Sequence, residues 1–417
     1  IQKGFQTMKS EEEYKNLCMA AVCRAQADWL IGMNGTRAYT TRYFKRLVVG
    51  RVQTPTLAML AERQERIEHF QKEAFYKVAL TDGKLTVVSE NIANEEAADL
   101  LAALCNGSTA VVTQMKKERK KSFPPKLYDL TSLQREANRY FGYTAKRTLD
   151  MLQELYEEKL VTYPRTDSQF VTEDMKDSVE ELVEKMPVLL SFVDYGQLGH
   201  GIKRVINNAK VSDHHAIIPT MEVAKADIGE LKERNRKILY LISARVLTAT
   251  ADPYIYESHK CQITCNYHTF YLTAKKTKQE GFKAIENKWK QFFGVKIEKE
   301  EPELDIWAGK HYGPCDSFVS EHFTQSPKQY TEDTLLSAME RAGNEELTED
   351  TEKKGLGTPA TRAAIIEKLI QSGFVKREKK NLVPTDDGNV LITVLPDEIK
   401  SPKMTAEWEM ALNHIAQ

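Results

Sequence analysis

The segment 162–168, Thr-Tyr-Pro-Arg-Thr-Asp-Ser, holds residue types that are well suited to covalent chemistry. Pro164 disfavours the α region for the preceding residue, so Tyr163 is expected to be extended. In an extended segment residues two apart point to the same side, which places the phenol of Tyr163 and the guanidinium of Arg165 in one space. Tyrosine can form a covalent intermediate, and arginine matches phosphate oxygens with a planar fork. The pair therefore suits attack on a phosphodiester, whereas the simpler interpretation of this peptide alone is a helix exit with surface side chains.

The composition limits the classes of protein to consider. The 417 residues allow about two to four domains. Formal net charge is −1, with 59 Lys and Arg against 60 Asp and Glu, so any nucleic-acid binding must use local basic patches. The six cysteines form no dense framework, which predicts a reduced, intracellular and cytoplasmic protein.

Neither a membrane span nor a zinc site is expected. No apolar run approaches the ~20 residues that cross a bilayer, and the start of the chain lacks a signal-peptide pattern. The first residue is Ile1, which predicts a chain that begins partway into a longer protein or has been processed. Cys261, Cys265 and His268 are spaced somewhat like metal ligands, but their segment also reads as a strand and no suitable fourth ligand is evident.

Helical and strand-like stretches alternate along the chain, in the order helical, β, helical, β, helical. No fixed-period repeat explains this order, but nested insertion does. We therefore expect a multidomain α+β protein with an outer helical domain, a β-rich domain inside it, and an innermost helical domain that carries Tyr163. The predicted divisions are 1–75 and 327–417 for the outer domain, 76–121 and 253–326 for the β-rich domain, and 122–252 for the innermost domain.

A compact pair of helices precedes Tyr163. The segment 131–134, Thr-Ser-Leu-Gln, has a capping-box pattern, and Gly142 is a plausible terminator of the first helix. The second helix is predicted from about Thr144 to Lys159, with Tyr156 on its buried face. Two helices joined by a Gly-containing turn resemble a helix-turn-helix.

A basic run lies between the first β segment and these helices. Residues 116–121 read Lys-Lys-Glu-Arg-Lys-Lys and lead into Ser-Phe-Pro-Pro. The simplest interpretation is a solvated linker, and the alternative is a strap that contacts phosphates.

Seven segments, in this order along the chain, resemble signature segments of the type IA DNA topoisomerases. They are CRAQADWLIG at 23–32, VGRVQTPTL at 49–57, YPRTDS at 163–168, DHHAIIPT at 213–220, GLGTPATR at 355–362, PTDDG at 384–388 and MTAEWE at 404–409. The resemblance implies a toroid in which the β-rich domain forms an arch. It also implies a strand-passing enzyme that cuts one DNA strand through a 5′-phosphotyrosine, passes another strand and reseals the cut without ATP.

The resemblance assigns roles to particular residues. Tyr163 would be the nucleophile, Arg165 would hold the scissile phosphate and offset developing charge, and His214 would contact DNA or assist at that phosphate. The single strand that leads to Tyr163 would be contacted by four residues: Arg24, Asp28, Arg51 and Gln53.

The glycine-rich segment 355–362 has a second reading. Taken alone, it is a loop that opens a helix at Pro359. Thr361 and Arg362 could then bind phosphate at the N-terminus of that helix.

The chain departs from the family pattern at its start. The family opens with an acidic Toprim domain that binds Mg²⁺, and neither an Asp-x-Asp pair nor a catalytic glutamate of that kind is found here. Mg²⁺ is therefore expected in the full-length enzyme, with its ligands outside this chain and no metal site within it. The expected partners are single-stranded and underwound DNA, and the chain alone should bind DNA but cleave poorly.

Other classes of protein were weighed. One is a module that binds single-stranded nucleic acid, with Tyr163 stacking on a base. Another is a helical scaffold that uses the ring to hold a partner protein. A tyrosine recombinase is excluded by order, because the His214 segment follows an early tyrosine. The sequence leaves open the balance of relaxation and decatenation, RNA as a substrate, the oligomeric state and any helicase partner.

Overall fold

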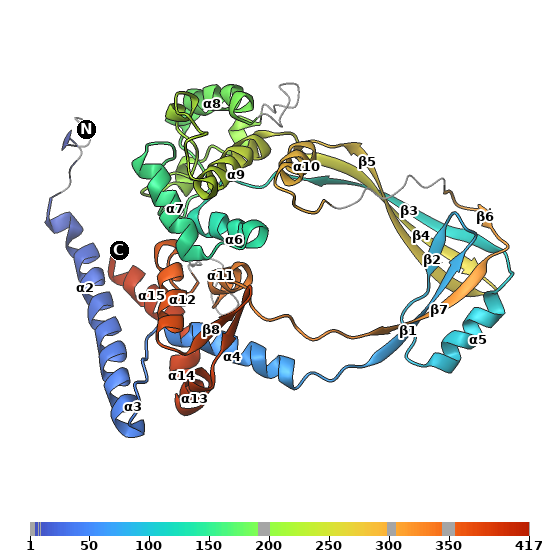
Figure 1. The fold of residues 1–417 in the computed structure, drawn as a ribbon, viewed down its shortest axis with the longest axis horizontal. Helices are drawn as coiled ribbons and strands as arrows, with labels where there is room; N and C mark the ends of the chain where they lie inside the picture. Colours follow the sequence, from blue (N-terminus) through green and yellow to red (C-terminus); the bar gives the residue numbers. More distant parts are fainter. Residues whose placement is uncertain are drawn as a thin grey trace.

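The chain forms a ring, with helices on one side and a β-sheet on the other (Figure 1). This computed structural model describes residues 5, 6, 8, 10–190, 201–297, 306–343 and 355–416. The polypeptide leaves the outer helices after α4 (Gln53–Glu68) and returns to them before α11 (Glu332–Arg341). The ring of helices and sheet confirms the predicted multidomain α+β toroid, while the exact domain divisions stay a prediction.

The outer helical part is built from both ends of the described chain. Its core joins Leu57 of α4 to Leu335 of α11 and to Phe374, so the two ends share one hydrophobic cluster. This shared core is the physical basis of the nested order. The remaining elements are α2 (Lys15–Trp29), a π-helical turn (Leu30–Gly35), α3 (Thr36–Tyr43), α12 (Pro359–Gln371), β8 (Val375–Glu378), β9 (Asn381–Pro384), α13 (Asp386–Val394), α14 (Asp397–Lys400) and α15 (Pro402–Ala416).

The inner helical part holds the two helices predicted before Tyr163. Its main helices are α6 (Leu130–Phe141), α7 (Ala145–Glu157), α8 (Lys176–Leu189), α9 (Glu233–Thr250) and α10 (Phe282–Phe292). Gly142 ends α6 with φ of 69°, and Thr144 caps α7, as predicted. The capping box of α6, however, is formed by Asp129 with Ser132 rather than by Thr131 with Gln134, because the helix begins two residues earlier than that pattern predicts, at Leu130.

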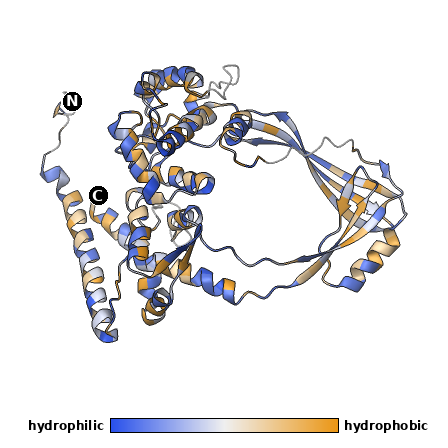
Figure 2. Cartoon of the chain, viewed as in Figure 1, coloured by the Kyte–Doolittle hydropathy of each residue, from blue (hydrophilic) through white to orange (hydrophobic). Residues whose placement is uncertain are grey.

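The far side of the ring is a seven-stranded antiparallel sheet with the order β6-β3-β4-β5-β2-β1-β7. Val78 and Phe270 belong to its fully buried core, which α5 (Glu95–Cys105) covers. Figure 2 shows hydrophobic residues gathered at this end of the ring. The strands are β1 (Ala74–Thr81), β2 (Thr86–Val88), β3 (Ala110–Ser122), β4 (Tyr254–Cys265), β5 (His268–Gln279), β6 (His311–Tyr312) and β7 (Asp316–Phe323).

The basic run 116–121 is part of a strand, so its interpretation as a solvated linker was wrong. β3 continues through the whole run and pairs with β4 as far as Ser122 opposite Tyr254. Because both faces are solvated along this stretch, the run shows no hydrophobic alternation that would reveal a strand in the sequence. Among the described helices, none combines the length and the apolar character of a membrane span.

Candidate active site

A short ladder brings the predicted catalytic segments together. The segment after α7 runs antiparallel to the segment 216–220, with Val161 opposite Pro219. Thr162 fixes this register, because its backbone N–H donates to the carbonyl of Ile218 at 3.0 Å and its hydroxyl donates to the carbonyl of Ala216 at 3.1 Å. The hydroxyl of Thr166 also donates to the carbonyl of His214 at 2.9 Å. Residues about 50 positions apart are thus held side by side.

Tyr163 lies half-buried between two other rings. The centroid of the His214 ring is 4.2 Å from that of Tyr163, at an interplanar angle of 33°. Tyr156 also packs edge-on against Tyr163, with ring centroids 5.6 Å apart and an interplanar angle of 84°. The prediction that Tyr156 belongs to the buried face of its helix was wrong, because the residue is 38% exposed. These contacts fix the plane of the Tyr163 ring.

A small pocket of about 130 Å³ lies beside this ring cluster. It joins the loop of Arg165 and the loop of His214 to the N-terminus of α12, which contributes Thr358, Pro359 and Ala360. Asp167 and Asp213 also line it. The dipole of a helix N-terminus favours an anion, and a guanidinium and an imidazole face the same space. The pocket can therefore receive a phosphate group next to Tyr163.

The turn before α12 requires glycine. Gly355 has φ of 65°, and a Cβ there would lie 2.4 Å from the carbonyl oxygen of Met339. Thr358 and Thr361 then close the helix start, since the backbone N–H of Thr358 donates to the Thr361 hydroxyl at 2.9 Å. Thr361 is thus placed at the helix N-terminus as the sequence indicated, with its hydroxyl engaged in the cap.

Arg362 lies inside the protein, although the sequence marked it as a phosphate ligand. Its side chain is buried, and its guanidinium donates to the carbonyl of Leu356 at 3.1 Å and to the hydroxyl of Thr131 on α6 at 3.0 Å. Burial lowers the pKa of Arg362, while the nearby Glu340 and Asp129 act in the opposite direction. In this structure Arg362 joins α12 to α6, and its contact with DNA stays a prediction.

Three of the four predicted strand-contacting residues form one charged cluster on the outer helices. Arg51 is buried and donates from Nε to Asp28 Oδ1 at 2.7 Å and from Nη1 to Glu409 Oε1 at 2.8 Å. Arg24 pairs with the same Glu409. Burial alone would lower the pKa of Arg51, but the two carboxylates raise it. The cluster ties α2 to α15, and the half-exposed side chains of Arg24 and Asp28 remain accessible.

Two further residues, Gln53 and Glu409, lie in the matching segments 49–57 and 404–409. Gln53 is buried at the start of α4, where it packs so closely against Gly50 that a Cβ there would lie 2.9 Å from its Nε2. Glu409 was not selected as a site residue from the sequence, although it lies in the matching segment 404–409. That segment was the only signal for it.

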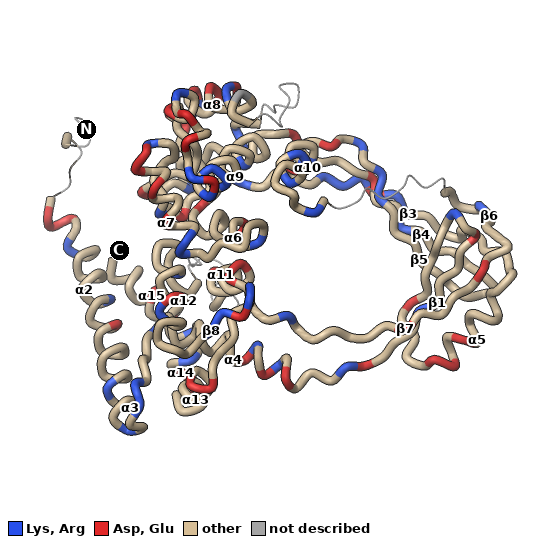
Figure 3. Tube along the Cα trace, viewed as in Figure 1, with Lys and Arg blue, Asp and Glu red and all other residues tan. Residues whose placement is uncertain are grey.

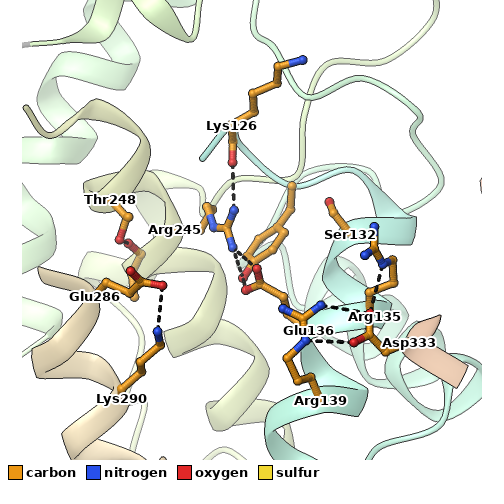
Figure 4. A network of polar contacts seen from close by, with 12 residues as sticks. Lys126, Ser132, Arg135, Glu136, Arg139, Arg245, Thr248, Glu286, Lys290 and Asp333 are labelled. Carbon is orange, nitrogen blue, oxygen red and sulfur yellow. Dashed lines mark hydrogen bonds and ion pairs between the residues drawn. The ribbon is translucent and has the colours of Figure 1, made fainter. Parts of the chain in front are cut away.

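A further polar cluster, which the sequence did not indicate, joins the inner and outer helices (Figure 4). Asp333 of α11 accepts from Arg135 Nε at 3.1 Å and from Arg139 Nε at 2.8 Å, both on α6. Its neighbour Glu332 is buried and accepts from the backbone N–H of Ala145 at the start of α7. We call these contacts of Glu332 and Asp333 the helix–helix junction.

The described residues offer no metal centre. Among them, no group of three His, Cys, Asp or Glu side chains is placed to hold an ion. Cys261 and Cys265 are buried thiols in β4, and His268 is exposed at the start of β5.

Comparisons with known proteins agree on one family. A family model described as DNA topoisomerase matches residues 12–417. DNA topoisomerase 3 of Bacillus licheniformis is 39% identical over 441 residues, and that of Bacillus subtilis is 38% identical over 439 residues. Each alignment covers 100% of this chain and 60% of the relative. The chain therefore spans about 60% of the length of these curated relatives.

The fold also has a counterpart among solved structures. Full-length topoisomerase I from Thermotoga maritima superimposes with a TM-score of 0.75 at 24% sequence identity. The match covers 97% of this chain and 65% of that one. The two molecules share the ring architecture.

Proposed function

Because the chain belongs to the type IA DNA topoisomerase family, we propose that it is the ring-forming part of an enzyme that cuts, passes and reseals DNA strands. The observation that carries this proposal is the pocket in which Arg165, His214 and the N-terminus of α12 meet beside Tyr163. The relatives are bacterial proteins, so the proposed place of action is the cytoplasm of a bacterium, with single-stranded or underwound DNA as the substrate.

In the proposed reaction, the phenolic oxygen of Tyr163 attacks the phosphorus of a phosphodiester. The bond from phosphorus to the 3′ oxygen breaks, the tyrosine proton is released and the 3′ oxygen takes up a proton. The product is a 5′-phosphotyrosine and a free 3′ hydroxyl. The reverse reaction reseals the strand. No ATP is needed, because the phosphotyrosine ester retains the energy of the broken phosphodiester bond.

The pocket residues have distinct proposed tasks. Arg165 and the N-terminus of α12, through its dipole and the N–H of Ala360, hold the phosphate and offset charge that develops on its oxygens. His214 orients the Tyr163 ring by stacking and faces the same phosphate. The Mg²⁺ that the family resemblance implies finds no ligand cluster among the described residues, so no step here is assigned to a metal.

Strand passage requires the ring to open, and we assign the opening to the helix–helix junction. The junction adjoins the pocket through Arg362, which links α12 to Thr131 at the start of α6. Arg24, Asp28, Arg51 and Gln53 are proposed to guide the single strand on the outer helices. The charged cluster supports this role by fixing α2 next to α15.

The test is formation of a covalent adduct. A 3′-end-labelled single-stranded oligonucleotide is incubated with the chain, and with the longer protein that contains it, and then analysed on a denaturing gel. A labelled band at protein size is expected from the longer protein and is lost in Tyr163→Phe. Tyr156→Phe is the matched control, since this tyrosine packs directly on Tyr163 and its change should leave the adduct in place.

Two other outcomes would overturn the proposal. An adduct that persists in Tyr163→Phe would assign the chemistry to another residue. DNA that is retained on a native gel but never forms an adduct, even with the longer protein, would favour the alternative of a binding module without cleavage activity.

A further inference from the structure

The strands that connect the inner helices to the far end of the ring concentrate positive charge (Figure 3). β3, β4 and β5 hold nine basic residues against two acidic ones, Glu118 and Glu257, in a chain whose formal net charge is −1. The basic residues are Lys116, Lys117, Arg119, Lys120, Lys121, Lys260, Lys275, Lys276 and Lys278. This surface lies outside the pocket and is not used by the proposed cleavage reaction.

The strand register shows which charges share a face. Residues directly opposite each other on antiparallel strands point to the same side of the sheet. Lys116 is opposite Lys260, Lys120 is opposite Tyr256, and Lys275 is opposite Ser258. One face of β3–β5 therefore carries Lys116, Lys120, Lys260, Lys275, Tyr254 and Tyr256, and we call it the strap face.

Among the described residues, the charges of Lys116, Lys120 and Lys260 on the strap face are only partly balanced. Like charges directly opposite each other destabilise a strand pair, yet Lys116 and Lys260 occupy such positions. The strap face offers them one carboxylate, Glu118, which lies 2.7 Å from Lys116 Nζ and 3.6 Å from Lys120 Nζ. Lys116 lowers the pKa of Glu118, with further contributions from Lys120 and Lys260. This excess of ammonium groups complements a polyanion.

The opposite face of the same strands also carries one carboxylate, Glu257, against five basic residues: Lys117, Arg119, Lys121, Lys276 and Lys278. Glu257 lies opposite both Arg119 and Lys276, and its carboxylate is 3.2 Å from Lys278 Nζ. The buried His259 also lies 3.5 Å from Glu257. Both faces are therefore net basic, and the strap face differs from the other in its two aromatic residues, Tyr254 and Tyr256.

Two tyrosines add a base-stacking element to the strap face. Tyr254 and Tyr256 lie on β4, the middle strand of the three, with ring centroids 5.1 Å apart and an interplanar angle of 23°. Both are half-buried, so each ring keeps an accessible part. Proteins that bind single strands combine a basic track for the backbone with aromatic rings on which bases stack. A duplex, whose bases are already stacked, cannot use the rings in this way.

From this arrangement we propose that the strap face is a second binding site for single-stranded DNA. Phosphates lie along Lys116, Lys120 and Lys260, and an unpaired base stacks on Tyr256. The site is separate from the pocket at Tyr163 and stands whether or not Tyr163 cuts DNA.

The proposal is tested by binding of a fluorescent oligothymidylate of about 12 nucleotides, measured by anisotropy in a Tyr163→Phe background so that cleavage cannot interfere. The strap-face variant is Lys116→Gln/Lys120→Gln/Lys260→Gln. The matched control carries the same change of charge on the opposite face of the same strands, Lys117→Gln/Lys121→Gln/Lys276→Gln. Thermal unfolding checks that both variants keep the fold.

We expect the strap-face variant to bind about 10-fold more weakly, and its slope of log K against log salt to fall by about 2, since each phosphate contact to a single strand contributes about 0.7. The control should stay within about 2-fold of the parent. Equal losses in the two variants would show a general electrostatic effect and overturn the proposal, and so would the absence of any loss.

Tyr256→Leu separates stacking from charge. It should weaken oligothymidylate binding by about 5-fold or more while leaving the affinity for a blunt hairpin duplex unchanged. If Tyr256→Leu weakened binding of single strand and duplex equally, or weakened neither, Tyr256 would not stack on a base. The assignment of the strap face to single strands would then be wrong.

Discussion

The ring is closed at two places that differ in kind. At the helix–helix junction, inner and outer helices meet through side chains: Asp333 with Arg135 and Arg139, and Glu332 with the N-terminus of α7. At the far end, segments distant in sequence share one continuous sheet, in which β1 pairs with β7 from Ala74 opposite Phe323 to Thr81 opposite Asp316.

This difference indicates which closure can open. Charged groups that separate at the junction regain water, which offsets much of the Coulomb attraction they lose. Separating strands of the sheet would expose the core around Val78 and Phe270 and leave backbone groups unpaired. We therefore expect the junction to act as the gate and the sheet end to remain intact while the ring opens.

The largest effect should come from the sheet core. Phe270 is fully buried, and Phe270→Ala should cost about 3–5 kcal/mol of local stability through lost burial and a cavity. Hydrogen exchange should show faster opening of amides in β4 and β5, with amides of α6 and α11 unchanged. If hydrogen exchange became equally faster in α6 and α11, the junction and the sheet end would unfold as one unit. The proposed difference between the two closures would then be wrong.

A second difference lies in the response to pH. Burial raises the pKa of Asp129, the cap of α6 beside the junction, from 3.8 to about 6, with its hydrogen bonds to Ser132 opposing. The folded form then holds a proton that the unfolded form releases, so stability contributed here is present below pH 3.8 and is lost as pH rises through about 6. A shift of this size corresponds to about 3 kcal/mol at most.

The sheet end offers a control of opposite sign. Burial acts to raise the pKa of Asp82, but hydrogen bonds from the backbone N–H groups of Leu85 and Lys84 outweigh it and lower the pKa. That contribution is present above pH 3.8 and is lost as pH falls through the lowered value. Asp129→Asn, which keeps a capping side chain, should flatten the pH dependence of junction stability between pH 4 and 6, and Asp82→Asn should not.

Glu332 tests whether the junction is the gate. Its buried carboxylate accepts from Ala145 on the inner side and from Arg377 Nη2 at 2.7 Å on the outer side. An amide in Glu332→Gln can serve only one of these donors well, so about 2 kcal/mol should be lost, which corresponds to about 30-fold more open ring. A pair of spin labels on α7 and α11 would measure the open fraction.

The matched control for this change is Glu367→Gln. Glu367 of α12 also pairs with Arg377, but that contact stays within the outer helical part. It should not change the open fraction. If Glu367→Gln opened the ring as much as Glu332→Gln, the effect would belong to Arg377 rather than to the junction.

Much of the fold could be predicted because its signals are local. Helix periodicity, Gly142 and Thr144 define α6 and α7 within a few residues, and the alternation of helical and strand-like stretches indicates nested insertion. The meeting of His214 with Tyr163 came from the family resemblance. Nothing in the local pattern of either segment specifies the ladder between Val161 and Pro219.

Other features depend on tertiary contacts that no local pattern contains. Glu332 and Asp333 read as ordinary acidic residues in the first turn of a helix, and only docking against α6 and α7 buries them. The basic run 116–121 becomes a strand because it pairs with β4, more than 130 residues later. Arg362 belongs to a matching segment, but its burial against Thr131 follows from how two distant helices pack.

Asp333 gives the smallest effect and the sharpest test of mechanism. Its contacts to Arg135 and Arg139 are partly solvated, with Arg139 46% exposed, so Asp333→Asn should cost about 1 kcal/mol. Because salt screens partly exposed pairs, the open fraction of the parent should rise with ionic strength and that of Asp333→Asn should rise less. Lys146→Gln removes the exposed pair with Asp150 on α7 alone and should change neither value. If neither salt nor Asp333→Asn changed the open fraction, the junction would be held by Glu332 and apolar packing. The junction and the sheet end would then differ in the backbone pairing of the sheet rather than in charge.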